Sequence, residues 1–231
     1  MLLFCCFFLS AALPHIWSGI IISRIFFDYI SEQPKSIEMS YKPINFDAKR
    51  RLLTALYRER HTGDCDYRRD GIDNCVHIEP KLIVLHMTGI DDFDESFKTM
   101  KDAELSENRK ELINKGDFML NVSAHYLIDK EGVIFSLMPD NMMARHAMGV
   151  NHLAIGIENV GLDNATAAQV EANVKLVSYL MRRYYIRKVI SHTEIHKLRD
   201  NKDPLYVEKI PDFFRNKECG DSITDQVRRR I

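Results

Sequence analysis

The sequence predicts an α/β fold in which helices flank a central mixed β-sheet. Two runs rich in β-branched and aromatic residues, AHYLIDK and VIFSLM, are separated by Glu131-Gly132 and indicate a β-hairpin. A third run, HLAIGIEN, is apolar on both faces, which is typical of an interior strand in a covered sheet. A helical pattern and a short strand, KVISH, follow it. Because a strand, a crossover helix and a strand in this order imply a parallel pair, we expect a mixed sheet.

The length and charge of the chain limit the classes of function. The 231 residues are 45% hydrophobic, and about 200 of them would remain without a leader, which suits one domain with a sizeable core. Lys and Arg number 32 against 33 Asp and Glu, so the charge balance does not indicate a nucleic-acid partner. We expect a monomer.

Residues 1–23 are predicted to be a signal peptide or a membrane anchor. Leu2–Ser23 contains no Asp, Glu, Lys or Arg, and the first such residue is Arg24. A bilayer takes about 20 residues to cross, but Pro14 and His15 interrupt the segment after a Ser-Ala-Ala triplet that resembles a cleavage site. No Lys or Arg precedes the apolar run, so both readings stay open. Either one implies a secreted or periplasmic protein, anchored to the membrane if the segment is retained.

Residues 24–79 are predicted to be an N-terminal extension and linker before the main domain at 80–231. Within the extension, Asn45 or Asp47 can cap a helix that runs to about Tyr57. The expected apolar face of this helix consists of Leu52, Leu53 and Leu56.

The cysteines of the extension bear on the compartment. Cys65 and Cys75 bracket the polar loop DCDYRRDGIDNC. An oxidising compartment would allow them to form a disulfide, whereas a reducing one would leave two free thiols, and the sequence leaves both open. In either case Cys219 is left without a cysteine partner outside the leader.

Two histidines are expected at strand ends on one side of the sheet. KLIVLHMT is an apolar run of strand length that is broken by His86 and should form a central strand. DESFKTMKDAEL and ENRKELINK have the pattern of short amphipathic helices beside a substrate groove. The strongest helix spans 165–185 and leads to KVISH, which ends in His192. The apolar stripe of that helix is Val170, Val174, Val177, Met181 and Tyr184.

Glu158, at the end of HLAIGIEN, is the residue that most directly suggests chemistry. A carboxylate in apolar surroundings is costly unless it has a partner or a function, although a Glu at a strand end often reaches solvent. His86 also has a purely structural interpretation, because a histidine near the end of a buried strand usually forms a hydrogen bond with a backbone carbonyl. The residue pattern alone leaves these readings open.

Three pieces, VSAHYLIDKEG, ARHAMG and NHLAIGIENVG, occur in an order and spacing that resemble a known family. They resemble the zinc-dependent N-acetylmuramoyl-L-alanine amidases of the peptidoglycan-recognition-protein and phage-lysozyme superfamily, and with flanking matches the resemblance spans 80–221. It implies an amidase-like fold, a Zn²⁺ cofactor and a peptidoglycan or muropeptide substrate. The implied reaction is hydrolysis of the amide bond between N-acetylmuramic acid and L-alanine.

The resemblance also implies a set of metal ligands. His86 and His192 match the family's two histidine positions, and the third ligand of the family is Asp or Cys, preceded by a catalytic Lys. Lys217 and Cys219 have the family's Lys-x-ligand spacing and are favoured, because zinc binds sulfur well and an unpaired Cys calls for an explanation. Lys202 and Asp203 are the second candidate pair, but there the two residues are adjacent. Two histidines, one anionic ligand and an open position form a catalytic zinc site.

The remaining roles follow from the same resemblance. Glu158 is expected to be the general base, since Ala124 stands where other members carry a catalytic Tyr. Lys217 would stabilise the oxyanion of the tetrahedral intermediate. His146 borders the bound sugar or peptide in the family and is a candidate for substrate contact. Asn151 is a second such candidate, with fixation of the loop before the strand as its other reading.

Two alternative functions stay open. Some family members bind peptidoglycan without cutting it, so a binding module of the same fold is the first alternative. Hydrolysis of another amide in a related muramyl substrate is the second. The sequence does not distinguish intact cell wall from soluble muropeptides or anhydro-muropeptides.

Overall fold

The computed structural model describes residues 36–106, 119–210 and 222–231. Residues 37–231 form one compact unit, to which all the elements below belong. The predicted leader at 1–23 and the predicted helix in ENRKELINK lie outside the described residues. Among the described helices, none combines the length and the apolar character that a membrane span requires.

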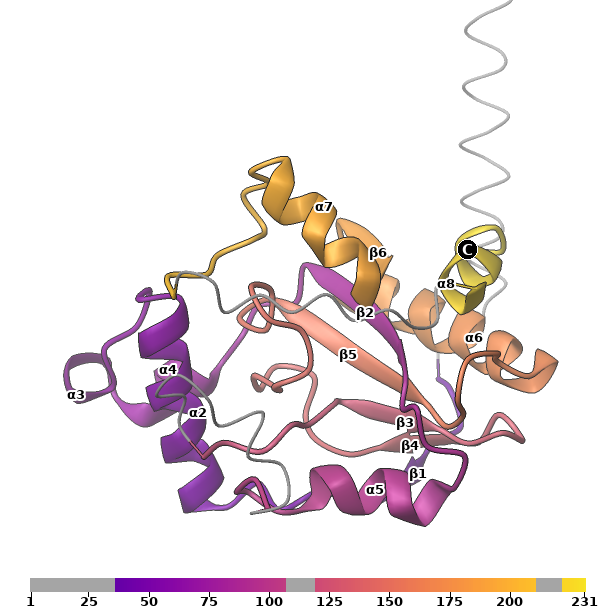
Figure 1. The fold of residues 1–231 in the computed structure, drawn as a ribbon, viewed down its shortest axis with the longest axis horizontal. Helices are drawn as coiled ribbons and strands as arrows, with labels where there is room; N and C mark the ends of the chain where they lie inside the picture. The colour runs from indigo at the N-terminus through magenta and orange to yellow at the C-terminus, as the bar shows by residue number, and fades with distance from the viewer. Residues whose placement is uncertain (1–35, 107–118, 211–221) are drawn as a thin grey trace, which may run out of the picture. The chain divides into compact units, whose positions relative to one another are not determined.

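A mixed β-sheet forms the centre of the unit, with its strands in the order β1-β4-β3-β5-β2-β6 (Figure 1). The strands β3, β5, β2 and β6 are parallel to one another, β4 is antiparallel to β3, and β1 is parallel to β4. The predicted hairpin is therefore present as β3 and β4. The strand bounds are β1 (Ser40–Tyr41), β2 (Leu82–Met87), β3 (Tyr126–Ile128), β4 (Ile134–Ser136), β5 (Ala154–Asn159) and β6 (Lys188–Ser191).

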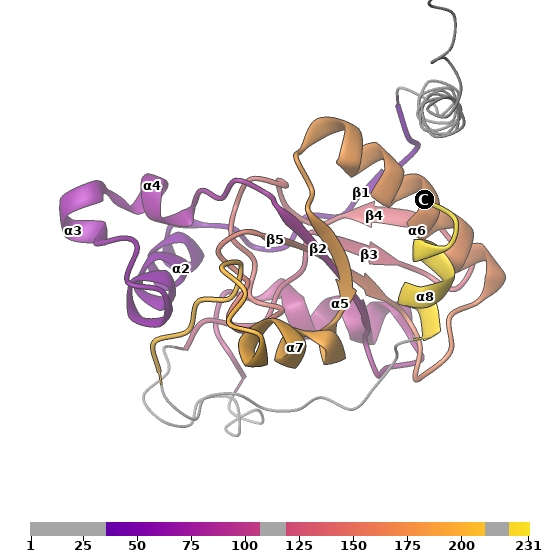
Figure 2. The same ribbon diagram turned by 90° about the horizontal axis from the view of Figure 1, so that it is seen from above.

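Helices cover the sheet on both faces, which confirms the predicted fold class. Figure 2 shows α6 and α7 on opposite sides of β2, and Figure 1 shows α2, α3 and α4 together at one end. The helices are α2 (Ala48–His61), α3 (Tyr67–Asp70), α4 (Ile72–Val76), α5 (Phe93–Lys101), α6 (Ala167–Arg183), α7 (Ile195–Asp200) and α8 (Ser222–Arg228), with a 3₁₀ turn, η2 (His192–Glu194), before α7.

The helix α6 packs on one face of the sheet together with α8. It begins with a capping box between Thr166 and Gln169, which satisfies two backbone N–H groups of its first turn. Val170, Val174 and Val177 are buried in the core of this face, as predicted. Met181, which the predicted stripe included, is 39% exposed, because its neighbour Leu180 occupies the core-facing position instead, while Tyr184 packs partly buried against the core.

The opposite face of the sheet carries a second apolar core, and the functional residues share it. Alternate residues of a strand point to opposite faces. Leu82 and Val84 of β2 pack with Ile195 and Leu198 of α7 on this second face. By the same alternation, the side chain of His86 points to the α7 side and not to the α6 side.

The helix α2 exists as predicted, but its expected apolar face is only partly buried, with Leu53 packed against the core. Asp47 caps it by accepting a hydrogen bond from the Arg50 N–H. Leu52 is 37% exposed, and the buried residues are instead Arg50, Thr54, Ala55, Tyr57 and His61. The guanidinium of Arg50 donates to the carbonyls of Met100, at 2.8 Å, and Asp102, which makes burial of this charged residue tolerable.

The segment predicted as an extension and linker packs within the same compact unit from residue 37 onward. Its strand β1 extends the sheet at the edge next to β4. Cys65 and Cys75, which the sequence left open, form a disulfide with Cα atoms 5.6 Å apart. The disulfide joins the loop after α2 to α4.

Candidate metal centre

Three strand ends meet at the carboxyl edge of the parallel strands. In the pairing of β2 with β5, His86 lies directly opposite Glu158, and Leu127 of β3 lies opposite Glu158 on its other side. In the pairing of β2 with β6, Leu85 lies opposite Ser191, so His192 follows at the next position. Because paired residues of parallel strands point to the same face, the two imidazoles and the carboxylate are placed on one side of the sheet.

The distances show that these side chains converge. The Nδ1 atoms of His86 and His192 are 3.0 Å apart, with the two rings edge to face. The Glu158 Oε1 atom lies 3.9 Å from the same Nδ1 atom of His86. The side chain of His86 is 1% exposed and that of Glu158 is 15% exposed, so the imidazole of His86 is the more deeply buried of the two.

The arrangement of the histidines fits a zinc ion. Two nitrogens bound to zinc at about 2.0–2.1 Å in tetrahedral geometry lie about 3.3–3.4 Å apart. The observed separation of 3.0 Å between the Nδ1 atoms of His86 and His192 is a few tenths of an ångström shorter. A small rotation of one ring would therefore bring both atoms into ligand positions, with Glu158 beside them.

The structure does not bring Asp203 to this cluster. Its carboxylate is bound by the ammonium of Lys188, the first residue of β6, and accepts a further hydrogen bond from Leu205 N–H. His192 lies four residues beyond Lys188, roughly 13 Å at the rise of a strand. The hydrogen bond from Lys188 also lowers the pKa of Asp203. Asp203 is thus an anion held at the opposite end of β6 from His192.

Asp203 and Lys202 have a local structural role instead. Lys202 takes a left-handed conformation, with φ of 51°, directly after α7. The Asp203 N–H donates to the carbonyl of Leu198 at 2.8 Å, which closes the end of the helix. The favoured pair, Lys217 and Cys219, lies outside the described residues, so its role as oxyanion stabiliser and third ligand stays a prediction.

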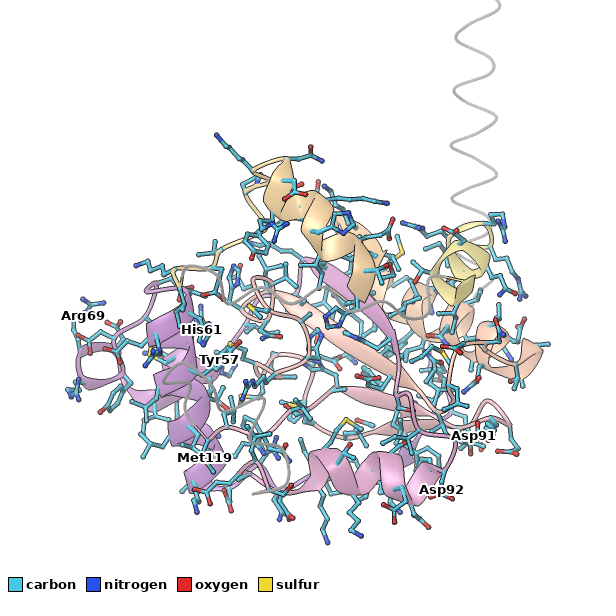
Figure 3. All side chains as sticks on the ribbon, in the orientation of Figure 1. Tyr57, His61, Arg69, Asp91, Asp92 and Met119 are labelled. Carbon is cyan, nitrogen blue, oxygen red and sulfur yellow. A yellow bond between two sulfur atoms is a disulfide. The ribbon has the colours of Figure 1, made fainter. Side chains whose placement is uncertain are left out.

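The two candidates for substrate contact, His146 and Asn151, are joined to each other by a hydrogen bond. Asn151 is 4% exposed, and its Oδ1 atom accepts from the backbone N–H groups of His146 and Ala147 at 3.0 and 2.8 Å. Its Nδ2 atom donates to the hydroxyl of Tyr57, which points inward from α2 (Figure 3). Asn151 therefore holds the loop before β5, and substrate contact would require these bonds to break.

His146 contacts a predicted ligand directly. Its Nδ1 atom lies 3.0 Å from the Nε2 atom of His86, and its own Nε2 atom lies 3.2 Å from the carbonyl oxygen of Ala154. Burial, with the neighbouring His125, lowers the pKa of His146 to about 3, so that the ring is neutral at pH 7. The contact with substrate predicted for His146 is not tested by this arrangement.

His125, the neighbour of His146, has a structural role in the core. It is fully buried; its Nε2 atom donates to the carbonyl of Met142 at 2.9 Å, and its Nδ1 atom accepts from the Gly156 N–H at 3.0 Å. Burial lowers its pKa to about 4, consistent with a neutral ring that has one donor and one acceptor.

A buried amide network that supports His86 was missed in the sequence. Asn159 donates to the backbone carbonyl of His86 at 3.0 Å, and Asn173 of α6 donates to Asn159 Oδ1 at 2.7 Å. Gln169, one turn earlier in α6, donates to the carbonyl of Val160 at 2.9 Å. The signal was present, because Gln169 and Asn173 interrupt the buried stripe of α6 at a spacing of one helical turn.

Residues 77–205, more than half of the chain, match the model of the N-acetylmuramoyl-L-alanine amidase family. The matched region contains His86, Glu158 and His192 and ends before Cys219. No curated protein matches the chain. The family match confirms the resemblance found in the sequence.

Solved structures of amidases and related proteins are similar to the chain. The endolysin amidase LysCS from Clostridium intestinale is 29% identical, with 51% of this chain and 72% of that chain covered and a TM-score of 0.39. The amidase AmiD from E. coli, in complex with anhydro-N-acetylmuramic acid-L-Ala-D-gamma-Glu-L-Lys, is 26% identical over 54% and 52% of the respective chains, with a TM-score of 0.41. Human PGRP-IBETAC, in complex with glycosamyl muramyl pentapeptide, is 18% identical over 52% and 78%, with a TM-score of 0.38. The match over residues 77–205 shows that the chain belongs to the N-acetylmuramoyl-L-alanine amidase family.

Proposed function

We propose that the protein is a zinc-dependent amidase that hydrolyses the bond between N-acetylmuramic acid and L-alanine in peptidoglycan or its fragments. One observation carries the proposal: two imidazole Nδ1 atoms, 3.0 Å apart, lie beside a partly buried carboxylate within the region that matches the amidase family. Such a cluster supplies two neutral ligands and a proton acceptor at one point.

The residues of the cluster divide into two roles. His86 and His192 would hold the ion through their Nδ1 atoms, and the third ligand that we propose is Cys219, with Lys217 close to it. When bound, zinc would lower the pKa of a water molecule toward about 7 and polarise the carbonyl of the scissile amide. Neutral imidazoles are the protonation state that this role requires.

Glu158 is the residue that we propose moves the proton. Its Oε1 atom, 3.9 Å from His86 Nδ1, can accept a proton from the attacking water as the bond from the water oxygen to the carbonyl carbon forms. The same carboxyl can then return that proton to the leaving nitrogen of L-alanine as the C–N bond breaks. The products are a free lactyl carboxylate on the sugar and a free stem peptide.

The first test is reversible removal of the metal. Treatment with a chelator should abolish release of free stem peptide from purified peptidoglycan or muropeptides, and added Zn²⁺ should restore it. Chromatography and mass spectrometry of the products would detect the peptide. Stem-peptide release that continues at full rate in the chelator would contradict a zinc mechanism.

The second test addresses the base. Glu158→Gln keeps the shape of the side chain but removes its basicity, so we expect a loss of about 100- to 10,000-fold in turnover. Zinc content should be retained, since Glu158 is not a proposed ligand. Glu131→Gln in the exposed turn of the hairpin is the matched control and should keep full activity. Near-full turnover in the Glu158 variant would contradict the role of Glu158 as the base but would leave the zinc mechanism intact.

The alternative is a peptidoglycan-binding module of the same fold that does not cut its ligand. One observation favours it: Asp203, the third-ligand candidate among the described residues, is occupied by Lys188. The zinc content of the purified protein, measured by atomic absorption, separates the two functions. Tight binding of muropeptides by a zinc-free, inactive protein would establish the binding module.

We also propose that the protein acts outside the reducing cytosol. The disulfide between Cys65 and Cys75 supports a secreted or periplasmic location, because such bonds persist in oxidising compartments. Fractionation of cells, with thiol labelling of the protein in each fraction, would test the location. Recovery from the cytosol with both thiols free would contradict it.

A further inference from the structure

The hydrogen bonds around His146 determine which nitrogen of its ring carries the proton. Its Nε2 atom lies 3.2 Å from the carbonyl oxygen of Ala154, and a carbonyl can only accept. The Nε2 atom of His146 must therefore be the donor. A neutral imidazole has one donor and one acceptor, so Nδ1 of His146 is left as an acceptor.

The tautomer of His86 follows from the tautomer of His146. The acceptor Nδ1 of His146 lies 3.0 Å from Nε2 of His86. This contact is a hydrogen bond only if His86 Nε2 carries the proton, because two lone pairs at that distance would repel each other. The Nδ1 atom of His86 is then unprotonated, and this is the atom that faces His192 and Glu158.

The position of the His146 ring is determined by a gap beside strand β5. A Cβ atom added at Gly156 of β5 would lie 2.6 Å from Cγ and 2.7 Å from Nδ1 of His146, too close for real atoms. The ring therefore sits in a niche that exists because residue 156 has no side chain. The backbone N–H of His146 is held separately by Asn151, so both the ring and the main chain of this residue are located.

We propose that His146 is a positioning residue that holds His86 in the Nε2–H tautomer and thereby presents the His86 Nδ1 lone pair as a metal ligand. Ligating histidines usually donate their second N–H to a carboxylate, a carbonyl or water. Here the acceptor is a neutral imidazole, which orients the ligand ring without adding negative charge to the site. The inference rests on the proposed zinc function.

Two matched variants distinguish the effect of the hydrogen bond on zinc affinity from the effect of side-chain packing. In His146→Asn the side-chain oxygen can occupy the place of Nδ1, whereas His146→Leu has the same branched shape with no acceptor. Loss of an outer-shell partner of a metal ligand typically weakens metal binding about 10- to 100-fold. We expect that loss in the Leu variant and recovery of most of the affinity in the Asn variant, measured by competition for Zn²⁺ with a chromophoric chelator. Circular dichroism verifies that both variants are folded.

A measurement on the metal-free, wild-type protein needs no variant. Long-range ¹H–¹⁵N correlation spectra report which nitrogen of each histidine ring is protonated. We expect His86 to carry its proton on Nε2 and His146 to do so as well. A proton on Nδ1 of His86 would overturn the inference, as would equal zinc affinity in the wild type and the Leu variant. If the wild-type protein bound no zinc, the proposed function would fail, while the tautomer of His86 would still decide this inference.

Discussion

The identity of the third ligand leads to the most discriminating prediction. Cys219→Ser should lose zinc, and Asp203→Asn should retain it. The Asp203 carboxylate is bound by Lys188 at the far end of β6, roughly 13 Å from the level of His192. An amide at position 203 would therefore leave the metal site unchanged.

The expected magnitudes follow from the ligand set and from the ion pair. Binding of structural zinc is worth about 10–16 kcal/mol for four ligands, or roughly 2.5–4 kcal/mol per ligand, so loss of Cys219 should weaken binding about 100-fold or more. The Lys188 side chain is 43% exposed, and partly exposed ion pairs contribute up to about 1 kcal/mol. Asp203→Asn should therefore cost at most about 1 kcal/mol in the free energy of unfolding, with no change in zinc affinity.

The assay is competition for Zn²⁺ with a chelator, together with urea denaturation of both variants. The pKa of folded Asp203 lies below its usual 3.8 because Lys188 binds the carboxylate. Its contribution to stability is therefore present above pH 4 and disappears as the pH falls through the folded pKa, so the stability deficit of Asp203→Asn should vanish at low pH. Loss of zinc in the Asp203 variant, with zinc retained in the Cys219 variant, would refute this reasoning.

Three further predictions concern stability. Replacing Cys65 and Cys75 with Ser should lower the free energy of unfolding by about 2.7 kcal/mol under oxidising conditions, for a loop with a sequence separation of 10; urea denaturation would measure this. Asn159→Leu removes the donor to the carbonyl in β2 and should cost about 1–3 kcal/mol, with the exposed Asn164→Leu as control. Because the folded pKa of His125 is about 4 against the usual 6.5, unfolding takes up protons between these values. Stability should therefore fall as the pH drops from 6.5 to 4, and His125→Gln should reduce that dependence.

The sheet was predictable because its strands leave local signals. KLIVLHMT and HLAIGIEN have the length and apolar character of interior strands, and the crossover helix before KVISH predicts that HLAIGIEN and KVISH run parallel. The two strands are parallel, but they are not neighbours, because each pairs with β2, which lies between them. Once β2 and β5 are neighbours, their alternation determines that His86 and Glu158 share a face. These signals are short-range in sequence, and the structure places the residues accordingly.

The buried face of α2 and the niche that holds the His146 ring could not be predicted from such local signals. Arg50 counts as polar in any periodicity, and its burial depends on carbonyls of Met100 and Asp102, about fifty residues away in the chain. The niche for His146 is created by an atom that Gly156 lacks. Such features arise from contacts between distant segments, which a pattern of apolar and polar residues does not encode.

The two predicted histidine ligands are held by different elements of the fold. The ring of His86 is located by His146 on the α7 side of the sheet, while its backbone carbonyl is bound by Asn159, whose own partner Asn173 lies in α6 on the other side. His86 is therefore fixed from both faces. His192 lies beyond the sheet in the turn η2, whose backbone is capped by Ser191 and Glu194. His86 should accordingly be the fixed reference of the metal site, because contacts from both faces of the sheet determine where its Nδ1 atom lies.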